Sequence, residues 1–220
     1  MYLNIWKTFF SERKNLILFI LNAILVVASL NLFARYLVFN ESRDYVVKLN
    51  DPLFNYFSAI DLDILAFTLI YIPIISFFVY ASFRPKGLLI AITSYWMLLI
   101  VRMFAMYVTP LDIPAGAIDL NDPIIFIIGT GQPVMRDLFF SGHTSTLTLL
   151  TLASFDIQKI SGSTIKLKAD RYYKYFILVS LIIVAFSVVL QKAHYTIDVF
   201  AAPFFAFGVY SFVKKLYRVA

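Results

Sequence analysis

Residues 175–213 read YFILVSLIIVAFSVVLQKAHYTIDVFAAPFFAFGVYSFV, and this stretch places the chain in a bilayer. It contains two apolar segments, 175–193 and 195–213, which meet at His194. A helix needs roughly 20 apolar residues to cross about 30 Å of hydrocarbon, and each segment has about that length. Because both segments are continuously apolar and do not alternate, they predict two transmembrane helices with a tight turn at His194, and not barrel strands.

Four further runs have the same character, namely 16–38, 62–83, 88–109 and 139–158. The chain of 220 residues is 61% hydrophobic and only 15% charged, with a mean hydropathy of +0.82, which is unlike a soluble domain. The first run follows Arg13 and Lys14 but is longer than a signal-peptide core, so we expect an uncleaved anchor. We therefore predict an all-α membrane protein with six transmembrane helices in a single domain, residues 1–220.

Basic residues are distributed unevenly between the two sides of these six runs. Thirteen lie on the side of the chain ends: Lys7, Arg13, Lys14, Arg84, Lys86, Lys159, Lys166, Lys168, Arg171, Lys174, Lys214, Lys215 and Arg218. Six lie on the other side: Arg35, Arg43, Lys48, Arg102, Arg136 and Lys192. Since cytoplasmic loops carry the excess of lysine and arginine, we predict that both termini are cytoplasmic. The net charge of +6 then indicates contact with anionic lipid, and the pattern does not predict nucleic-acid binding.

The only two histidines of the chain lie in the segments 141–144 (SGHT) and 194–198 (HYTID). Both segments fall at the end of an apolar run on the predicted external side. A histidine is costly at membrane depth and is therefore a functional candidate by default. We predict an active site that opens to the periplasmic, extracellular or luminal face of a multi-pass membrane protein.

His194 and Asp198 are spaced i, i+4, which on a helix places them on one face, one turn apart. A carboxylate there can accept a hydrogen bond from one imidazole nitrogen and leave the other nitrogen as a directed nucleophile or base. The alternative interpretation is a polar pair that only satisfies itself near the membrane interface.

The segment 141–144 predicts an anion site at the start of a helix. Ser141 is placed to cap the helix and Gly142 lets a ligand approach the backbone, while free N–H groups at a helix N-terminus bind phosphate. His143 would lie beside that phosphate as a general acid. The alternative is a capped helix start with one incidental histidine.

The sequence predicts no metal and no cofactor. Asp61 and Asp63 could suggest a metal site, but they begin an apolar run without other ligands, and we interpret them as a solvated helix start. Metal-dependent phosphatidyltransferases need several aspartates at helical spacing, and no such set exists in this sequence. The absence of cysteine excludes thiolate nucleophiles, zinc–cysteine sites and disulfides.

Three blocks together resemble the type 2 phosphatidic acid phosphatase superfamily and, within it, the sphingomyelin synthase family. The blocks are 102–109 (RMFAMYVT) with Leu111 and Pro114, 137–144 (DLFFSGHT) with Thr146 and Thr148, and 194–199 (HYTIDV). The resemblance implies that His194, oriented by Asp198, attacks the lipid phosphate and becomes a phospho-histidine. It further implies that His143 protonates the departing diacylglycerol oxygen and later helps to deprotonate the acceptor hydroxyl, which belongs to ceramide in a synthase and to water in a hydrolase.

The phosphate ligands depart from the phosphatase branch, which has an arginine where this chain has Val188. The candidates here are Arg102, Ser141, Gly142, Arg136 and Lys192. The alternatives are an ion pair inside the bundle for Arg102 and interfacial snorkelling for the other two cations. Differences from the synthase pattern at Ala105, Met135 and Pro203 leave the head group and the acceptor open.

The function predicted is a sphingomyelin synthase-like phosphotransferase that moves phosphocholine or phosphoethanolamine from a glycerophospholipid to ceramide or a related lipid alcohol. One alternative is a lipid phosphatase or phospholipase C that uses the same His-His-Asp site with water. Another is a non-catalytic lipid-binding or transport protein, against which the retained His143, His194 and Asp198 argue. The expected partners are a phospholipid donor, a lipid alcohol acceptor and the bilayer, with a homo-oligomer left open.

Overall fold

A computed structural model describes residues 2–118, 120, 134–161 and 170–219. This part of the chain is helical apart from its connections and one isolated bridge between Val47 and Leu111. Its helices are α1 (Tyr2–Ser11), α2 (Arg13–Glu41), the short 3₁₀ helix η1 (Pro52–Asn55), α3 (Asp63–Ala81), α4 (Pro85–Val108), α5 (Gly142–Ser161), α6 (Asp170–Leu190) and α7 (Thr196–Leu216).

Each of the six predicted apolar runs is a helix, and the ends differ for local reasons. Helix α4 begins three residues before the predicted run, at Pro85, because proline has no N–H to lose at the first helical position. Helix α5 begins only at Gly142, because the Ser141 side chain caps it and the preceding residues are not helical.

Five of the long helices are long and apolar enough to cross a membrane: α2, α3, α4, α6 and α7. Helix α5 does not meet that standard, because its first half is rich in serine and threonine. It packs against α3, α4, α6 and α7, so protein surrounds it where lipid would require an apolar surface. Hydroxyls of Thr148 and Thr151 bond to carbonyls one turn earlier, which satisfies them inside the bundle.

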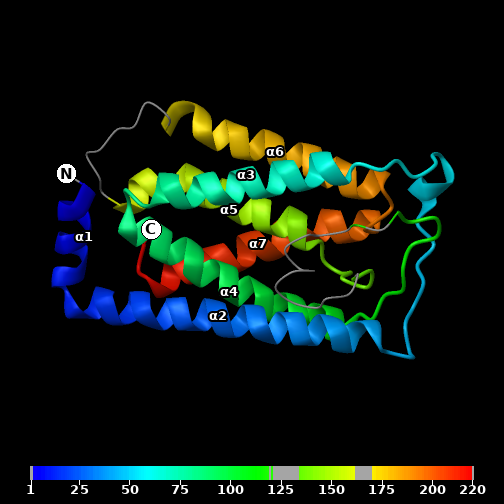
Figure 1. The fold of residues 1–220 in the computed structure, drawn as a ribbon, viewed down its shortest axis with the longest axis horizontal. Helices are drawn as coiled ribbons and strands as arrows, with labels where there is room; N and C mark the ends of the chain where they lie inside the picture. The colour runs from blue at the N-terminus through cyan, green and yellow to red at the C-terminus, as the bar shows by residue number, and fades with distance from the viewer. Residues whose placement is uncertain (1, 119, 121–133, 162–169, 220) are drawn as a thin grey trace.

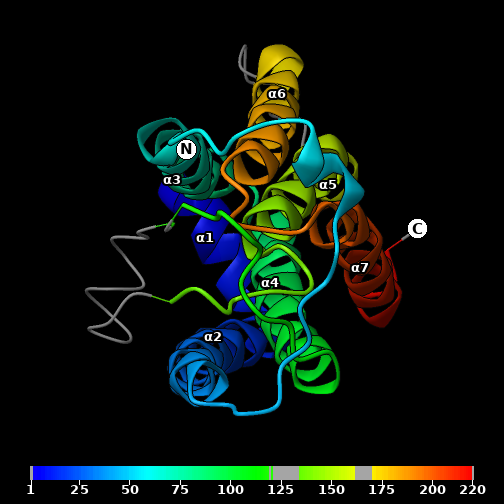
Figure 2. The same cartoon turned by 90° about the vertical axis from the view of Figure 1, so that its right-hand side faces the viewer.

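The six long helices run side by side, and α1 lies across one end of the bundle (Figure 1). The indole of Trp6 on α1 donates a hydrogen bond to the carbonyl of Ser82, between α3 and α4. Viewed down the bundle, α4 and α5 lie between the outer helices (Figure 2). Many large apolar side chains face outward, among them Ile24, Phe186 and Phe204, as expected of a surface in contact with lipid.

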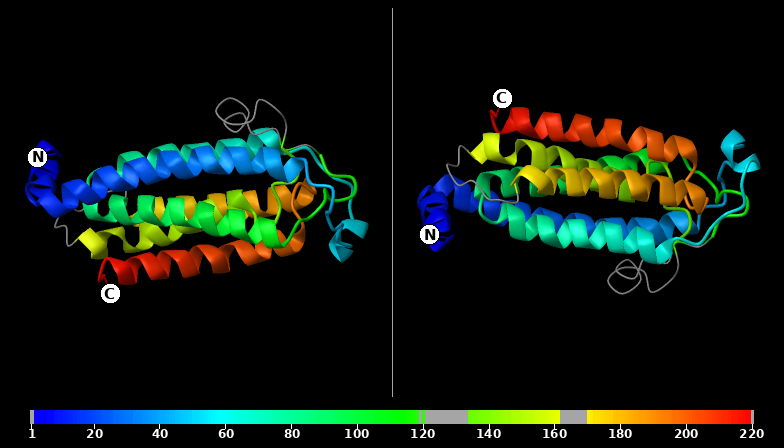
Figure 3. Two further views of the ribbon diagram at one scale, coloured as in Figure 1. Left: turned by 90° about the horizontal axis from the view of Figure 1, so that it is seen from below. Right: turned by 90° about the horizontal axis from the view of Figure 1, so that it is seen from above.

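Both termini lie at the end that carries α1, which we call the terminal end (Figure 3). The opposite end carries the α2–α3 and α6–α7 connections and is called the site end. The two chain ends therefore lie at one end of the bundle, and the side of the membrane that they face stays a prediction. Two lysines used for the orientation, Lys166 and Lys168, lie outside the described residues.

Candidate active site

The N-terminus of α5 is built around Ser141, which is fully buried at the site end. Its hydroxyl accepts hydrogen bonds from the backbone N–H of Thr144 at 3.3 Å and from the Thr144 hydroxyl at 3.1 Å. Its own N–H donates to the carbonyl of Asp198 at 3.1 Å. The predicted cap is therefore present, and it also joins the start of α5 to the start of α7.

Gly142 allows Arg102 of α4 to lie directly against the start of α5. A Cβ atom at residue 142 would lie 2.5 Å from the guanidinium carbon of Arg102, closer than real Cβ contacts. The sequence predicted that glycine would admit a ligand, and in this structure it admits an arginine side chain. A cation thus lies beside the helix terminus that was predicted to bind phosphate.

Arg102 is buried, and its contacts occupy one side of the guanidinium. Nε donates to the carbonyl of Phe140 at 2.9 Å, and Nη2 lies 2.7 Å from Oδ1 of Asp137. The cation also lies 5.2 Å from the ring centre of Phe33. No described residue accepts a hydrogen bond from Nη1, so that nitrogen is open to a ligand in this structure.

His194 lies in the turn between α6 and α7, and Asp198 lies in the first turn of α7. Nδ1 of His194 is 3.4 Å from Oδ2 of Asp198, the long end of hydrogen-bond range, and both residues are buried. The same oxygen accepts from the backbone N–H of Tyr195 at 3.3 Å. His194 precedes the helix, so the pair forms across the helix start and not along a helix face. With the proton on Nδ1, Nε2 carries the free electron pair.

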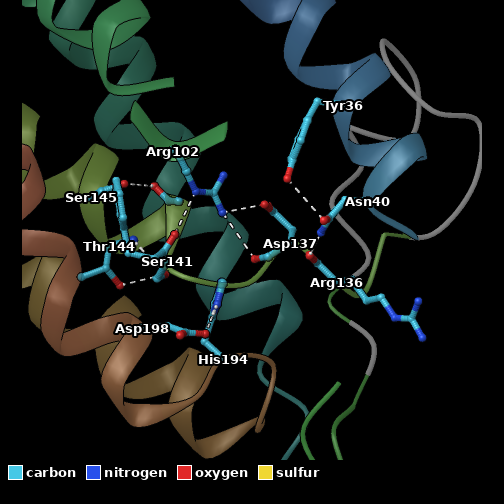
Figure 4. Close-up of polar contacts among 12 residues, drawn as sticks. Tyr36, Asn40, Arg102, Arg136, Asp137, Ser141, Thr144, Ser145, His194 and Asp198 are labelled. Carbon is cyan, nitrogen blue, oxygen red and sulfur yellow. Dashed lines mark hydrogen bonds and ion pairs between the residues drawn. The ribbon is translucent and has the colours of Figure 1, made fainter. Parts of the chain in front are cut away.

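The two histidines face each other across the site, although 51 positions separate them in the sequence. Their ring centres are 6.1 Å apart with the planes at 67°, and the ring of Phe67 from α3 lies 6.0 Å from His143. Figure 4 shows Arg102 and His194 reaching toward one space from α4 and from the α6–α7 turn. A phosphate there would meet two imidazole rings and a guanidinium.

Arg136 and Lys192 have other partners in the structure. Arg136 extends away from His194 (Figure 4), pairs with Asp112 at 3.1 Å and donates to the carbonyls of Glu41 and Arg43. Lys192 donates to the carbonyl of Phe54 at 2.8 Å and lies over the Phe54 and Phe57 rings. Of the three predicted phosphate cations, Arg102 is the one that the structure places against Gly142 at the start of α5.

Two residues at the site were not predicted from the sequence. Asp137, the partner of Arg102, stands in the second motif block, and the need of a buried arginine for a carboxylate could have identified it. Tyr195 is 1% exposed, and its hydroxyl bonds to the outer loops at Asp112 and Leu49. Those partners are backbone atoms, so no residue type in the sequence indicates these hydrogen bonds.

The residues that the structure describes contain no group of three or more His, Cys, Asp or Glu that could hold a metal ion. Asp61 and Asp63 lie at the start of α3, where the Asp61 carboxylate accepts from the N–H of Asp63 at 3.1 Å. Asp63 in turn accepts a hydrogen bond from Gln191. These contacts fit the predicted helix start.

Comparison with known proteins gives one family match. Residues 136–216 match the family model described as PAP2 superfamily C-terminal, which supports a relation to lipid phosphatase-type enzymes. The match includes His143, His194 and Asp198, covers less than half of the chain, and leaves Arg102 outside. It carries nothing specific to sphingomyelin synthases. No curated protein matches the chain.

Proposed function

We propose that this multi-pass membrane protein is a phosphotransferase that moves a phospholipid head group from a glycerophospholipid to ceramide or a related lipid alcohol. The observation that carries the proposal is the facing of His143 and His194 at 6.1 Å, with Asp198 behind His194 and Arg102 at the start of α5. The family match over these histidines supports phosphoryl chemistry on lipids. The block at 102–109, which resembles the synthases, supports transfer to a lipid alcohol.

In the first step, Nε2 of His194 attacks the donor phosphorus. A nitrogen–phosphorus bond forms, and the bond from phosphorus to the diacylglycerol oxygen breaks. His143, in its protonated form, gives that oxygen its proton, so diacylglycerol leaves as a neutral alcohol. Asp198 stabilises the imidazolium through Nδ1, and Arg102 with the α5 N–H groups stabilises the phosphate oxygens.

In the second step, the acceptor hydroxyl attacks the same phosphorus atom. His143, now neutral, takes the hydroxyl proton, the oxygen–phosphorus bond forms, and the bond to His194 breaks. Both histidines return to their starting protonation states. One pair of groups thus serves both half-reactions.

A lipid phosphatase or phospholipase C is the second candidate, and the match to the PAP2 superfamily favours it. The first half-reaction is the same, and water replaces the lipid alcohol in the second. The two candidates differ in the acceptor alone.

The test is mass spectrometry of lipids after purified protein is incubated in vesicles with mixed phospholipids, with and without ceramide. Transferase activity gives diacylglycerol and a ceramide that carries the head group in equal amounts. A hydrolase gives diacylglycerol and a water-soluble phosphate whether or not ceramide is present. His194→Ala should abolish both products, and Asp198→Asn should lower the rate by about 10⁴-fold.

Asp156→Asn is the matched control, because Asp156 pairs with Lys214 near the terminal end. It should keep the rate of the unmodified protein. Product formation that survives His194→Ala would contradict the proposal.

We also propose that the site end faces away from the cytoplasm, because most basic residues lie toward the terminal end. The chain has no cysteine, so a single cysteine at Ser42 would report its side without background. An impermeant maleimide should label it in intact cells. Labelling only after the membrane is opened would reverse the orientation.

A further inference from the structure

The ion pair between Arg102 and Asp137 changes the charge of the predicted phosphate site. Oδ1 of Asp137 lies 2.7 Å from Nη2 of Arg102, and the two side chains are 14% and 5% exposed. Asp137 balances the positive charge of Arg102. Arg136 and Lys192 contact other groups, so neither adds an unpaired positive charge beside Arg102. A phosphate that binds at Nη1 therefore has a carboxylate for a neighbour.

This arrangement disfavours a donor that carries only negative charge. A phosphate monoester dianion, or an anionic diester, would bring like charge close to Asp137 in a largely buried site with one paired cation. A zwitterionic diester brings one negative charge for Arg102 and one positive charge for the carboxylate. Oδ2 of Asp137 accepts no hydrogen bond from any described residue, so it is open to such a cation.

We propose that Asp137 is a specificity-determining residue that binds the cationic group of the donor head group while Arg102 binds its phosphate. The proposal rests on the proposed function and adds a residue that selects the head group by charge. Selection arises as much from repulsion of anionic donors as from attraction of the cation. Asp137 takes no part in the transfer of the phosphoryl group itself.

The test compares two donors that share the phosphodiester and differ in head-group charge, phosphatidylcholine and phosphatidylglycerol, in vesicles of fixed composition. The protein as it exists should prefer phosphatidylcholine. Asp137→Asn keeps the shape and an oxygen for Arg102, and should lower the ratio of the two kcat/KM values by about 10- to 100-fold. Asp137→Glu should retain the preference.

Asp112→Asn is the matched control, because Asp112 pairs with Arg136 at the same end of the bundle. It should leave the donor ratio unchanged. An unchanged ratio in Asp137→Asn, or an equal fall with both donors, would overturn the proposal and assign Asp137 a purely positioning role. Activity of the unmodified protein on neither donor would instead refute the proposed function.

A measurement on the unmodified protein covers the case in which Asp137→Asn does not fold. Dodecylphosphocholine and dodecyl phosphate present the same chain with and without the cation. The zwitterion should compete more strongly with the donor. Stronger competition by dodecyl phosphate would overturn the proposal.

Discussion

Two buried arginine–aspartate pairs lie at opposite ends of this helix bundle, and they are built differently. At the terminal end, Nη2 of Arg84 lies 2.7 and 2.8 Å from the two carboxylate oxygens of Asp170, with side chains 0% and 9% exposed. The guanidinium also lies 4.8 Å from the ring centre of Tyr80. At the site end, Arg102 contacts a single carboxylate oxygen of Asp137 and also donates to the backbone carbonyls of Phe140 and Asp137.

We interpret the first pair as structural and the second as the pair that takes a ligand. Both carboxylate oxygens of Asp170 contact Arg84, and this pair joins the start of α4 to the start of α6. Arg102 contacts only Oδ1 of the Asp137 carboxylate, and Oδ2 accepts no hydrogen bond from any described residue. Asp137 belongs to the segment before α5 and not to a second helix. Loss of one partner from either pair leaves a buried charge, and we expect a change in turnover only from the pair beside the start of α5.

The largest effect is expected on stability, from Arg84→Met. Asp170 would keep a buried charge without its arginine, and loss of one partner of such a pair costs about 3–5 kcal/mol of unfolding free energy. Denaturation in detergent measures the change, while the turnover per folded molecule should stay constant. Lys214→Met removes a more exposed pair at the same end and should cost less than about 1 kcal/mol. Equal losses from both variants would refute the distinction.

The next effect is expected on turnover, from Arg102→Gln. Glutamine can keep one hydrogen bond but has no charge for the phosphate, and loss of one such electrostatic contact lowers rates by about 10²- to 10³-fold. Arg102→Lys should not restore the rate, because lysine cannot hold the Phe140 carbonyl, Asp137 and phosphate with one planar group. The measurement is kcat/KM for head-group transfer, and a loss below fivefold in Arg102→Gln would exclude Arg102 from phosphate binding.

The sequence alone was sufficient to predict the six long helices and the approach of the two histidines at one end, but α1 and η1 were not predicted. Continuous apolar runs cross a bilayer as helices. The tight turn between α6 and α7 then brings His194 to one end of the bundle. Helix α5 is the exception in composition, because burial among four helices removes the need for an apolar surface. Its place inside the bundle cannot be read from its own residues.

The partners of the basic residues near the site could not be predicted from the sequence. Arg102 and Asp137 are 35 positions apart, and no local period joins them. Arg136 and Lys192 were predicted to bind phosphate because they are basic residues near the motifs, yet both donate to loop carbonyls. Which cation reaches a site depends on how the loops fold, and backbone acceptors have no residue-type signature.

Gly142→Ala should move Arg102 without removing its charge. The new Cβ would lie 2.5 Å from the guanidinium carbon, so Arg102 must shift away from the start of α5. Overpacking of this kind costs about 1–3 kcal/mol, and we expect a fall in turnover of about 10- to 100-fold. Gly208→Ala is the control, because nothing lies within 4 Å of a Cβ there.

A double variant shows whether the glycine acts through the arginine. In the Arg102→Gln background the guanidinium is gone, so Gly142→Ala should lower turnover far less than it does alone. Strictly multiplicative losses would mean that Gly142 serves the site by another route, such as close approach of the lipid to the backbone.

The smallest effect is expected from Tyr195→Phe, which loosens the outer loops at the site end. The phenol donates to the carbonyl of Asp112 at 2.9 Å and accepts from the N–H of Leu49 at 3.2 Å. Both loops reach solvent, where water can replace the lost partner, so the cost should be about 1 kcal/mol.

Burial raises the pKa of Tyr195 above its ordinary value of 10.0. A group whose pKa is raised by folding adds stability that is fully present below the unfolded pKa and lost as pH rises through the folded pKa. The stability difference between the two proteins should therefore be constant from about pH 6 to 9 and shrink above about pH 10, as measured by denaturation at each pH. A difference that already changes between pH 6 and 8 would mean that another titrating group, and not this phenol, fastens the loops.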